Sequence, residues 1–139
     1  MVQLIVGEKG KGKTKYLLDK ANTAVETATG NIVYLDKSQK HMHELSNKVR
    51  LINVKDYPVN NCDEFLGFIS GIISQDYDLQ EMYLDSFLTI ANCTDAYLVH
   101  AIETLDVISE KFNVKFVLSI SKGAAELPES VKAKCVVAL

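Results

Sequence analysis

Short apolar runs alternate with longer segments of helical periodicity along the whole chain. Runs rich in β-branched and aromatic residues predict strands at residues 2–6, 31–36, 49–53, 80–85, 114–120 and 135–139. Helices are predicted at about 13–27, from 61 onward and at about 95–112, with shorter helical segments at about 38–47 and 86–92. Alternating strands and helices favour a parallel sheet covered on both faces. We therefore predict an α/β fold, a three-layer α/β/α sandwich with a mostly parallel sheet of about five to six strands.

The helix that starts at Asn61 has two distinct faces. Asn61 is followed three residues later by Glu64, which resembles a capping box. Apolar residues then recur at helical spacing, at positions 65, 66, 68, 69, 72 and 73. Small residues occupy much of the remaining face; they are Gly67, Ser70, Gly71 and Ser74. We predict that this helix packs closely on the sheet, with Gly67 and Gly71 in the contact, and a small-residue dimer face is the alternative.

Composition places the chain among ordinary globular proteins. Its 139 residues, 47% of them hydrophobic and 24% charged, favour a single domain spanning residues 1–139. A net charge of −3 indicates no general attraction to nucleic acids or anionic membranes. We expect no signal peptide and no membrane span, because the first strand begins at residue 2 and no apolar run is long enough. We expect a cytoplasmic protein in which Cys62, Cys93 and Cys135 are buried, reduced thiols.

The loop after the first predicted strand carries the clearest chemical signal. Residues 7–14 read Gly-Glu-Lys-Gly-Lys-Gly-Lys-Thr, which is the G-x-x-x-x-G-K-T phosphate-binding pattern between a strand and a helix. The glycines can adopt backbone angles that turn N–H groups toward an anion, and the helix adds its positive end. Lys13 would contact the β- and γ-phosphates, and the Thr14 hydroxyl would bind Mg²⁺. The predicted phosphate-binding residues are Gly7, Glu8, Lys9, Gly10, Lys11, Gly12, Lys13, Thr14 and Lys15.

An aspartate at the end of the fourth predicted strand completes the predicted site. Asp85 follows an apolar run, and the carboxyl ends of parallel strands meet at one edge of the sheet. We predict that Thr14 and Asp85 hold Mg²⁺ and that Lys13 and Asp85 are the catalytic residues. Asp36 also ends a strand and competes with Asp85 for this role.

Other polar residues near the predicted strand ends bear on hydrolysis. Ser86 follows Asp85 at the place where many related ATPases carry the glutamate that activates water, and a hydroxyl is no strong base at neutral pH. Ser119 and Ser121 end the fifth strand, either as γ-phosphate sensors or as ordinary polar residues. Arg50 is the only arginine, and we expect its short strand to lie away from the phosphates.

The loop at residues 7–14 and the strand ending at Asp85 resemble those of P-loop nucleoside triphosphatases. The strands predicted between them resemble the layout of the RecA-like branch, and no Asn-Lys-x-Asp or Asp-x-x-Gly motif of GTPases is present. The chain is also similar to short bacterial ATP-binding proteins that often carry a twitching-motility ATPase label. Thymidine kinases share the layout, but this chain lacks their Asp-Glu pair after the fourth strand, their zinc cysteines and their arginine-bearing lid. The resemblance implies ATP as ligand or substrate and Mg²⁺ as cofactor.

Three functions follow from these observations. The first is an ATP-binding protein with weak hydrolysis, or hydrolysis that depends on a second copy or a protein partner supplying a catalytic group. The second is a nucleoside or nucleotide kinase, and the third is a non-hydrolysing nucleotide sensor or assembly subunit. The first and third share every motif, so the sequence leaves them open.

Overall fold

The computed structural model describes residues 1–139, and its elements follow the predicted alternation of strands and helices. Six strands form one all-parallel sheet in the order β3-β2-β4-β5-β1-β6. The strands are β1 (Val2–Val6), β2 (Asn31–Asp36), β3 (Val49–Asn53), β4 (Leu79–Leu84), β5 (Lys115–Ile120) and β6 (Cys135–Ala138). The α-helices are α1 (Lys13–Thr27), α2 (Cys62–Ser74), α3 (Phe87–Ile90), α4 (Leu98–Phe112) and α5 (Glu129–Lys132).

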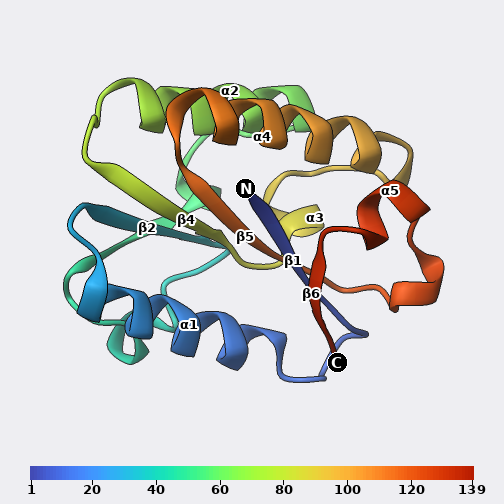
Figure 1. Cartoon of the computed structure of the whole chain (residues 1–139), viewed down its shortest axis with the longest axis horizontal. Helices are drawn as coiled ribbons and strands as arrows, with labels where there is room; N and C mark the ends of the chain where they lie inside the picture. Colours follow the sequence, from blue (N-terminus) through green and yellow to red (C-terminus); the bar gives the residue numbers. More distant parts are fainter.

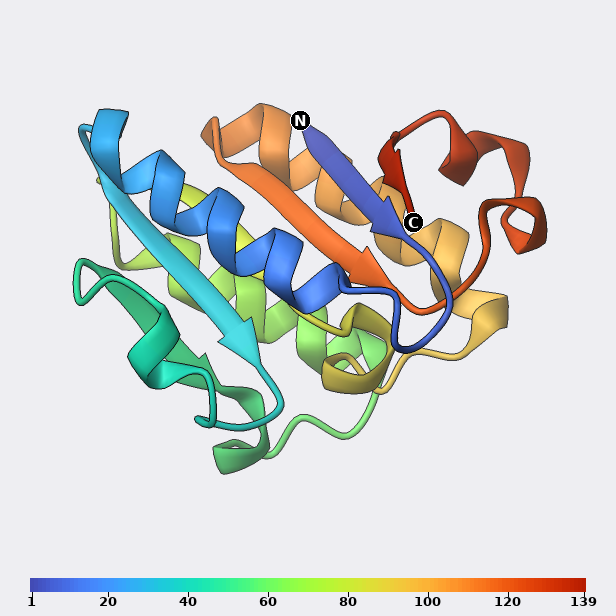
Figure 2. The same ribbon diagram turned by 90° about the horizontal axis from the view of Figure 1, so that it is seen from below.

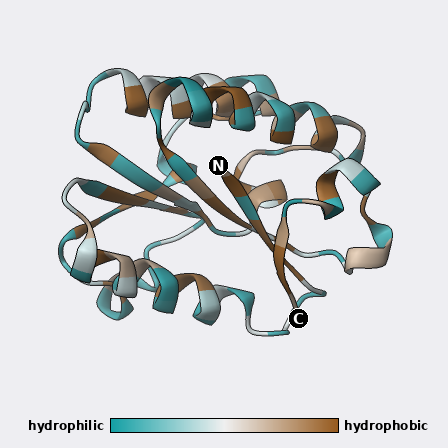
Figure 3. Cartoon of the chain, in the orientation of Figure 1, coloured by the Kyte–Doolittle hydropathy of each residue, from teal (hydrophilic) through white to brown (hydrophobic).

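The helices lie on both faces of the sheet, which confirms the predicted three-layer α/β/α architecture (Figure 1). Helices α2 and α4 cover one face and α1 crosses the other, as the view from below also shows (Figure 2). A cluster of 28 buried residues lies on the α2 and α4 side, and a cluster of 10 lies beneath α1. Hydrophobic stretches, in brown, run along the strands, and the helices carry both hydrophobic and hydrophilic stretches (Figure 3). No helix combines the length and the apolar character needed to cross a lipid bilayer.

The strand order decides which loops meet. Strand β5 lies between β1 and β4, with Val6 paired to Ile120 and Leu84 paired to Leu118. The carboxyl ends of β1, β5 and β4 therefore meet at one edge of the sheet, where open α/β sheets bind ligands. Strand β2 is the other neighbour of β4, and β3 forms the edge beyond it. Arg50 lies exposed on β3, with three strands between it and β1, away from the loop after β1 as expected.

The predicted helix at 38–47 is wrong, because the structure has only a 3-10 turn there, Met42–Glu44. The side chain of Asn22 on α1 donates to the Glu44 carbonyl at 2.8 Å and accepts from the Ser46 N–H at 2.8 Å. These bonds hold the backbone in an irregular path. Of residues 38–47, only Leu45 is buried. A segment with one buried side chain has no apolar stripe to hold a helix on the sheet.

Smaller differences concern the ends of elements. The helix predicted at 95–112 begins with a separate 3-10 turn, Asp95–Tyr97, before α4. The short helix α5 and the 3-10 turns Val54–Asp56 and Ala124–Glu126 were not predicted as helical. Single turns such as these are fixed by neighbouring packing more than by sequence periodicity.

Helix α2 packs on the sheet as predicted, but the close contact predicted at Gly67 and Gly71 is wrong. Phe65, Ile69 and Ile73 are buried on the sheet side of the helix. Gly67 and Gly71 are exposed, and a Cβ atom added to either would have no other atom within 4 Å. The large apolar residues occupy the sheet-facing side because burying them removes most apolar area from water. The small residues are left facing solvent, and the dimer alternative stays untested.

Candidate functional site

The loop between β1 and α1 has the backbone conformation of an anion cradle. Gly10 and Gly12 adopt φ angles of 87° and 89°, in the left-handed region that favours glycine. Gly12 is also the N-cap of α1 and offers no side-chain hydrogen bond to the helix, whose first turn holds no acidic residue. The first N–H groups of α1 are therefore not capped by a side chain and carry the positive end of the helix dipole.

Lys13 points back across this loop. Its side chain is buried, with 7% of the residue exposed, and Nζ donates a hydrogen bond of 2.8 Å to the Glu8 carbonyl oxygen. Burial lowers the pKa of the Lys13 ammonium, and the nearby negative charge of Asp85 opposes that shift. A cation held at a helix N-terminus can contact a bound anion with little loss of side-chain entropy.

Asp85 stands directly after β4, buried, with three hydroxyl groups around it. Thr14 Oγ1 donates to Asp85 Oδ1 at 3.2 Å, and Ser119 Oγ donates to the same oxygen at 3.0 Å. The Tyr34 hydroxyl donates to Asp85 Oδ2 at 2.9 Å. Burial, followed by the charge and hydrogen bond of Asp85, raises the pKa of the Tyr34 hydroxyl, which keeps it a donor. Four elements thus fix this carboxylate: β4, α1, β5 and β2.

The backbone turns sharply after Asp85. Ser86 has φ 55° and ψ 56°, the left-handed conformation that L residues rarely adopt. Its N–H donates to Ser119 Oγ at 2.7 Å, and the same hydroxyl donates to Asp85. This bond helps to hold a conformation that costs about 1–2 kcal/mol in an isolated chain. Backbone strain of this kind is often found beside functional groups.

These elements enclose a polar cavity of about 440 Å³ at the carboxyl ends of the strands. Its lining contains no hydrophobic residue and consists of Lys9, Gly10, Gly12, Lys13, Thr14, Lys37, Asp85, Ser86, Thr89, Ser119 and Ser121. Three lysines and one aspartate give it a positive balance, which favours an anion.

The structure brings most of the predicted site residues together, but not all. Gly7, Glu8, Lys11 and Lys15 are absent from the cavity lining. Gly7 is buried at the base of the loop, where a Cβ atom would lie 2.9 Å from the Leu139 carbonyl oxygen. Glu8 and Lys11 are exposed, and Lys15 forms an exposed ion pair with Asp19 at 3.1 Å. Of these four, only Glu8 contacts a cavity residue through a hydrogen bond, by accepting from Lys13.

Asp36 differs from Asp85 in its partners. It is 2% exposed at the end of β2, and Oδ1 accepts from the Lys37 N–H at 2.7 Å. Its other oxygen, Oδ2, is buried without a hydrogen-bond partner. Burial raises the pKa of the Asp36 carboxyl, and the charge of Asp85 acts in the same direction. The Thr14 hydroxyl pairs with Asp85 and makes no hydrogen bond to Asp36.

Sequence reasoning missed three residues of the site: Tyr34, Lys37 and Thr89. Tyr34 carried a usable signal, since a tyrosine in an otherwise aliphatic buried strand needs a partner for its hydroxyl. Lys37 directly follows β2, and Thr89 lies in α3. Only the strand order brings these two residues to the cavity. No local pattern distinguishes them from other surface residues.

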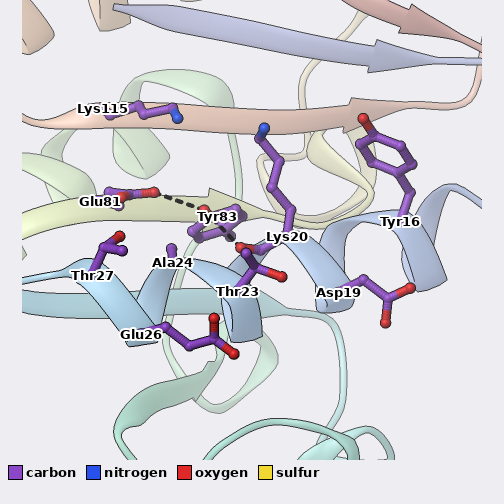
Figure 4. Close-up of a pocket in the computed structure, with 10 residues that line it drawn as sticks. All are labelled: Tyr16, Asp19, Lys20, Thr23, Ala24, Glu26, Thr27, Glu81, Tyr83 and Lys115. Carbon is purple, nitrogen blue, oxygen red and sulfur yellow. Dashed lines mark hydrogen bonds between the residues drawn. The ribbon is translucent and has the colours of Figure 1, made fainter.

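A second cavity, of about 490 Å³, lies between α1 and strands β4 and β5 (Figure 4). Glu81 and Lys115, paired across the two strands, line it together with residues of α1. The Tyr83 hydroxyl donates to Glu81 Oε1 at 2.7 Å, and burial followed by this bond raises the pKa of Tyr83. This cavity shares no residue with the loop at residues 7–14, and its lining carries both positive and negative side chains. The cavity at the strand ends is therefore the stronger candidate site.

Comparison with known proteins supports the fold. No protein-family model and no curated protein matches the chain. Among solved structures, C. elegans PCH-2, a protein of the P-loop class, matches with a TM-score of 0.52 at 11% identity. The match covers 98% of this chain and 33% of that one, so this chain spans about a third of its length. At this identity the likeness concerns the fold alone, and it agrees with the three-layer α/β/α architecture.

Proposed function

We propose that this chain binds ATP with Mg²⁺ at the cavity beside the phosphate-binding loop, and that on its own it hydrolyses ATP slowly. The observation that carries the proposal is the arrangement of Lys13, Thr14 and Asp85 around one polar cavity at the strand ends. These residues come from the start of α1 and the end of β4, 71 positions apart, and meet only in the fold.

The donor set suits a magnesium ion. Thr14 Oγ1 and Asp85 Oδ1 lie 3.2 Å apart and are both hard oxygen ligands. Mg²⁺ commonly takes one or two protein oxygens and completes its shell with water and substrate phosphates. When bound, the ion would neutralise charge on the phosphate oxygens. In that state the Thr14 hydroxyl would leave Asp85, whose oxygens keep hydrogen bonds from Ser119 and Tyr34.

The phosphates would be held by the loop and the surrounding lysines. The uncapped N–H groups of α1 and the ammonium group of Lys13 face the same cavity, and Lys9 and Lys37 add two further positive charges. Lys13 would exchange its bond with the uncharged Glu8 carbonyl for a bond to a phosphate oxygen, in which both partners are charged.

The layout of the sheet is in keeping with the RecA-like branch suggested by the sequence. Strand β5 separates the strand of the phosphate-binding loop from the strand of Asp85, and it places Ser119 between them. The structural neighbour PCH-2 supports the fold that carries this cavity, and the ligand is inferred from the residues of the cavity.

Slow hydrolysis follows from the surroundings of the cavity. Attack on the γ-phosphate needs a positioned water molecule and a group to orient it. Ser86 is no strong base, and Arg50 lies on β3, with three strands between it and β1. Asp36 is a further carboxylate, at the end of the neighbouring strand β2, but it is 2% exposed and does not line the cavity. A second copy or a protein partner would have to supply the missing group or uncover Asp36.

The test is binding and turnover of ATP by the purified chain with and without Mg²⁺. Changing Lys13 to Ala removes a charge-assisted contact of about 1.5–3 kcal/mol, which weakens ATP binding about ten- to a hundredfold. Unchanged affinity in this variant would overturn the assignment of the site. Turnover on the order of 10 s⁻¹ by a dilute monomer would overturn slow hydrolysis. Transfer of phosphate from ATP to a labelled nucleoside would favour the kinase alternative. Tight binding of ATP with no turnover would favour the sensor alternative.

A further inference from the structure

Two cysteines that are distant in the sequence meet on the α2 side of the sheet. Cys62 is the first residue of α2, and Cys93 lies in the loop after α3. Cys93 Sγ and Cys62 Sγ are 3.1 Å apart, although the residues are separated by 31 positions. Both are free thiols with 5% and 8% of the residue exposed. The third cysteine, Cys135, is partly buried on β6 and has no such neighbour.

We propose that Cys62 and Cys93 form a reversible intramolecular disulfide when the folded protein meets a low-molecular-weight disulfide. The two sulfur atoms need to approach by only about 1 Å to reach the length of a disulfide bond. The backbone around them is already held together, since the Asn92 side chain donates to the Val59 carbonyl at 2.8 Å. Asn92 itself has φ 50°, a left-handed turn that directs the chain back toward α2.

The surroundings of the two thiols indicate which reacts first. Cys62 lines a cavity of about 280 Å³, together with Asn61, Asp63, Asn92, Thr94 and Tyr97, and we infer that a small reagent would approach the pair through this cavity. Cys93 does not line that cavity. Burial, followed by the hydrogen bond with Cys62, raises the pKa of the Cys93 thiol to about 12, so Cys93 keeps its proton and donates it to Cys62 Sγ. Cys62 is therefore the attacking thiol and Cys93 the resolving thiol.

The exchange balances without any further reagent. Cys62 loses a proton, its thiolate attacks one sulfur of the small disulfide, and one small thiolate leaves. Cys93 then loses its proton and attacks Cys62 Sγ, and the second small thiolate leaves. Each departing thiolate takes up one of the released protons. One small disulfide is reduced to two thiols, and the two cysteines of the protein are oxidised to one disulfide.

The bond would tie the lining of the cavity at the strand ends to α2. The segment between the two cysteines contains Asp85, Ser86 and Thr89, which line that cavity. Closing a loop of this length restricts the unfolded chain and stabilises the folded one. We expect the midpoint of thermal unfolding to rise by roughly 10 °C on oxidation.

The experiment exposes the folded, full-length chain to mixtures of reduced and oxidised glutathione, with acid quenching, intact mass and peptide mapping. The main sample is Cys135→Ser, which keeps the pair and removes the third thiol. We expect the loss of two hydrogens, a peptide linking Cys62 to Cys93, full reversal by reduced glutathione, and a higher unfolding midpoint. Cys62→Ser should form no internal link.

Three outcomes would overturn the proposal. The first is a lasting glutathione adduct on Cys62 with no internal link. The second is a link that appears only in denaturant, and the third is an unfolding midpoint that falls on oxidation. If Cys62→Ser does not fold, the peptide map of Cys135→Ser still decides the question, because it contains only the two proposed partners.

Discussion

Replacing Asp85 with Asn separates the metal contribution of this residue from its structural one. The substitution keeps the shape of the side chain and one carbonyl oxygen but removes the negative charge. Asp85 is 2% exposed and accepts hydrogen bonds from Thr14, Ser119 and Tyr34, at 3.2, 3.0 and 2.9 Å. Hydroxyl groups can rotate to donate or accept. The variant therefore keeps most of this network, and we expect it to fold.

The expected effect depends on magnesium. Loss of a charged ligand contact of about 1.5–3 kcal/mol should weaken Mg-ATP binding about ten- to a hundredfold. Without the metal, the wild-type carboxylate repels the phosphates, so metal-free ATP should bind the variant at least as tightly as the wild type. The ratio of the two affinities is the informative quantity, because a general loss of folding would lower both.

The assay is calorimetric titration with ATP in excess Mg²⁺ and again in a chelator, with thermal unfolding of each variant as the check on folding. Asp36→Asn is the matched control, because it removes a buried carboxylate from the neighbouring strand end without touching Thr14. Equal weakening of Asp85→Asn with and without Mg²⁺ would refute the metal role. If Asp36→Asn alone shows the magnesium-dependent loss, the ion lies at β2 instead.

Three further changes test other parts of the structure. Burial raises the pKa of Asp36, so the folded state binds more protons than the unfolded state between the ordinary carboxyl pKa and the raised one. Wild-type stability should therefore fall relative to Asp36→Asn as pH rises through that window, and parallel urea-unfolding curves across pH would contradict this. Gly71→Ala should stabilise the monomer by about 0.5–1 kcal/mol, because Gly71 is an exposed helical glycine with open space around it. A destabilised or dissociated assembly would instead indicate that this face is a contact between chains. Gly7→Ala places a Cβ atom 2.9 Å from the Leu139 carbonyl oxygen, and urea unfolding should show a loss of about 1–3 kcal/mol. If the Gly7→Ala variant is as stable as the wild type, Leu139 moves away from the added Cβ atom without a cost in free energy.

Local sequence patterns determined much of the molecule. The pattern at residues 7–14 gave the strand, loop and helix around the phosphate-binding loop, because glycine spacing and helix capping act over a few residues. The runs of apolar residues gave all six strands within about two residues, since a strand buried on both faces must be apolar throughout. The sequence also placed Asp85 at the end of a strand.

Only the tertiary structure decided which distant groups meet. The strand order β3-β2-β4-β5-β1-β6 cannot be deduced from the sequence of any single strand. This order brings Tyr34 to Asp85 and Lys37 to the cavity. It also leaves Asp36 with a buried, unpartnered oxygen, and it places the thiol of Cys62 beside that of Cys93, although the two are far apart in the sequence. The same applies to α2, where both faces have helical spacing and the side that meets the sheet is the one that buries more apolar area. Contacts between distant residues depend on how whole elements pack, and a pattern confined to one element carries no information about its neighbours in space.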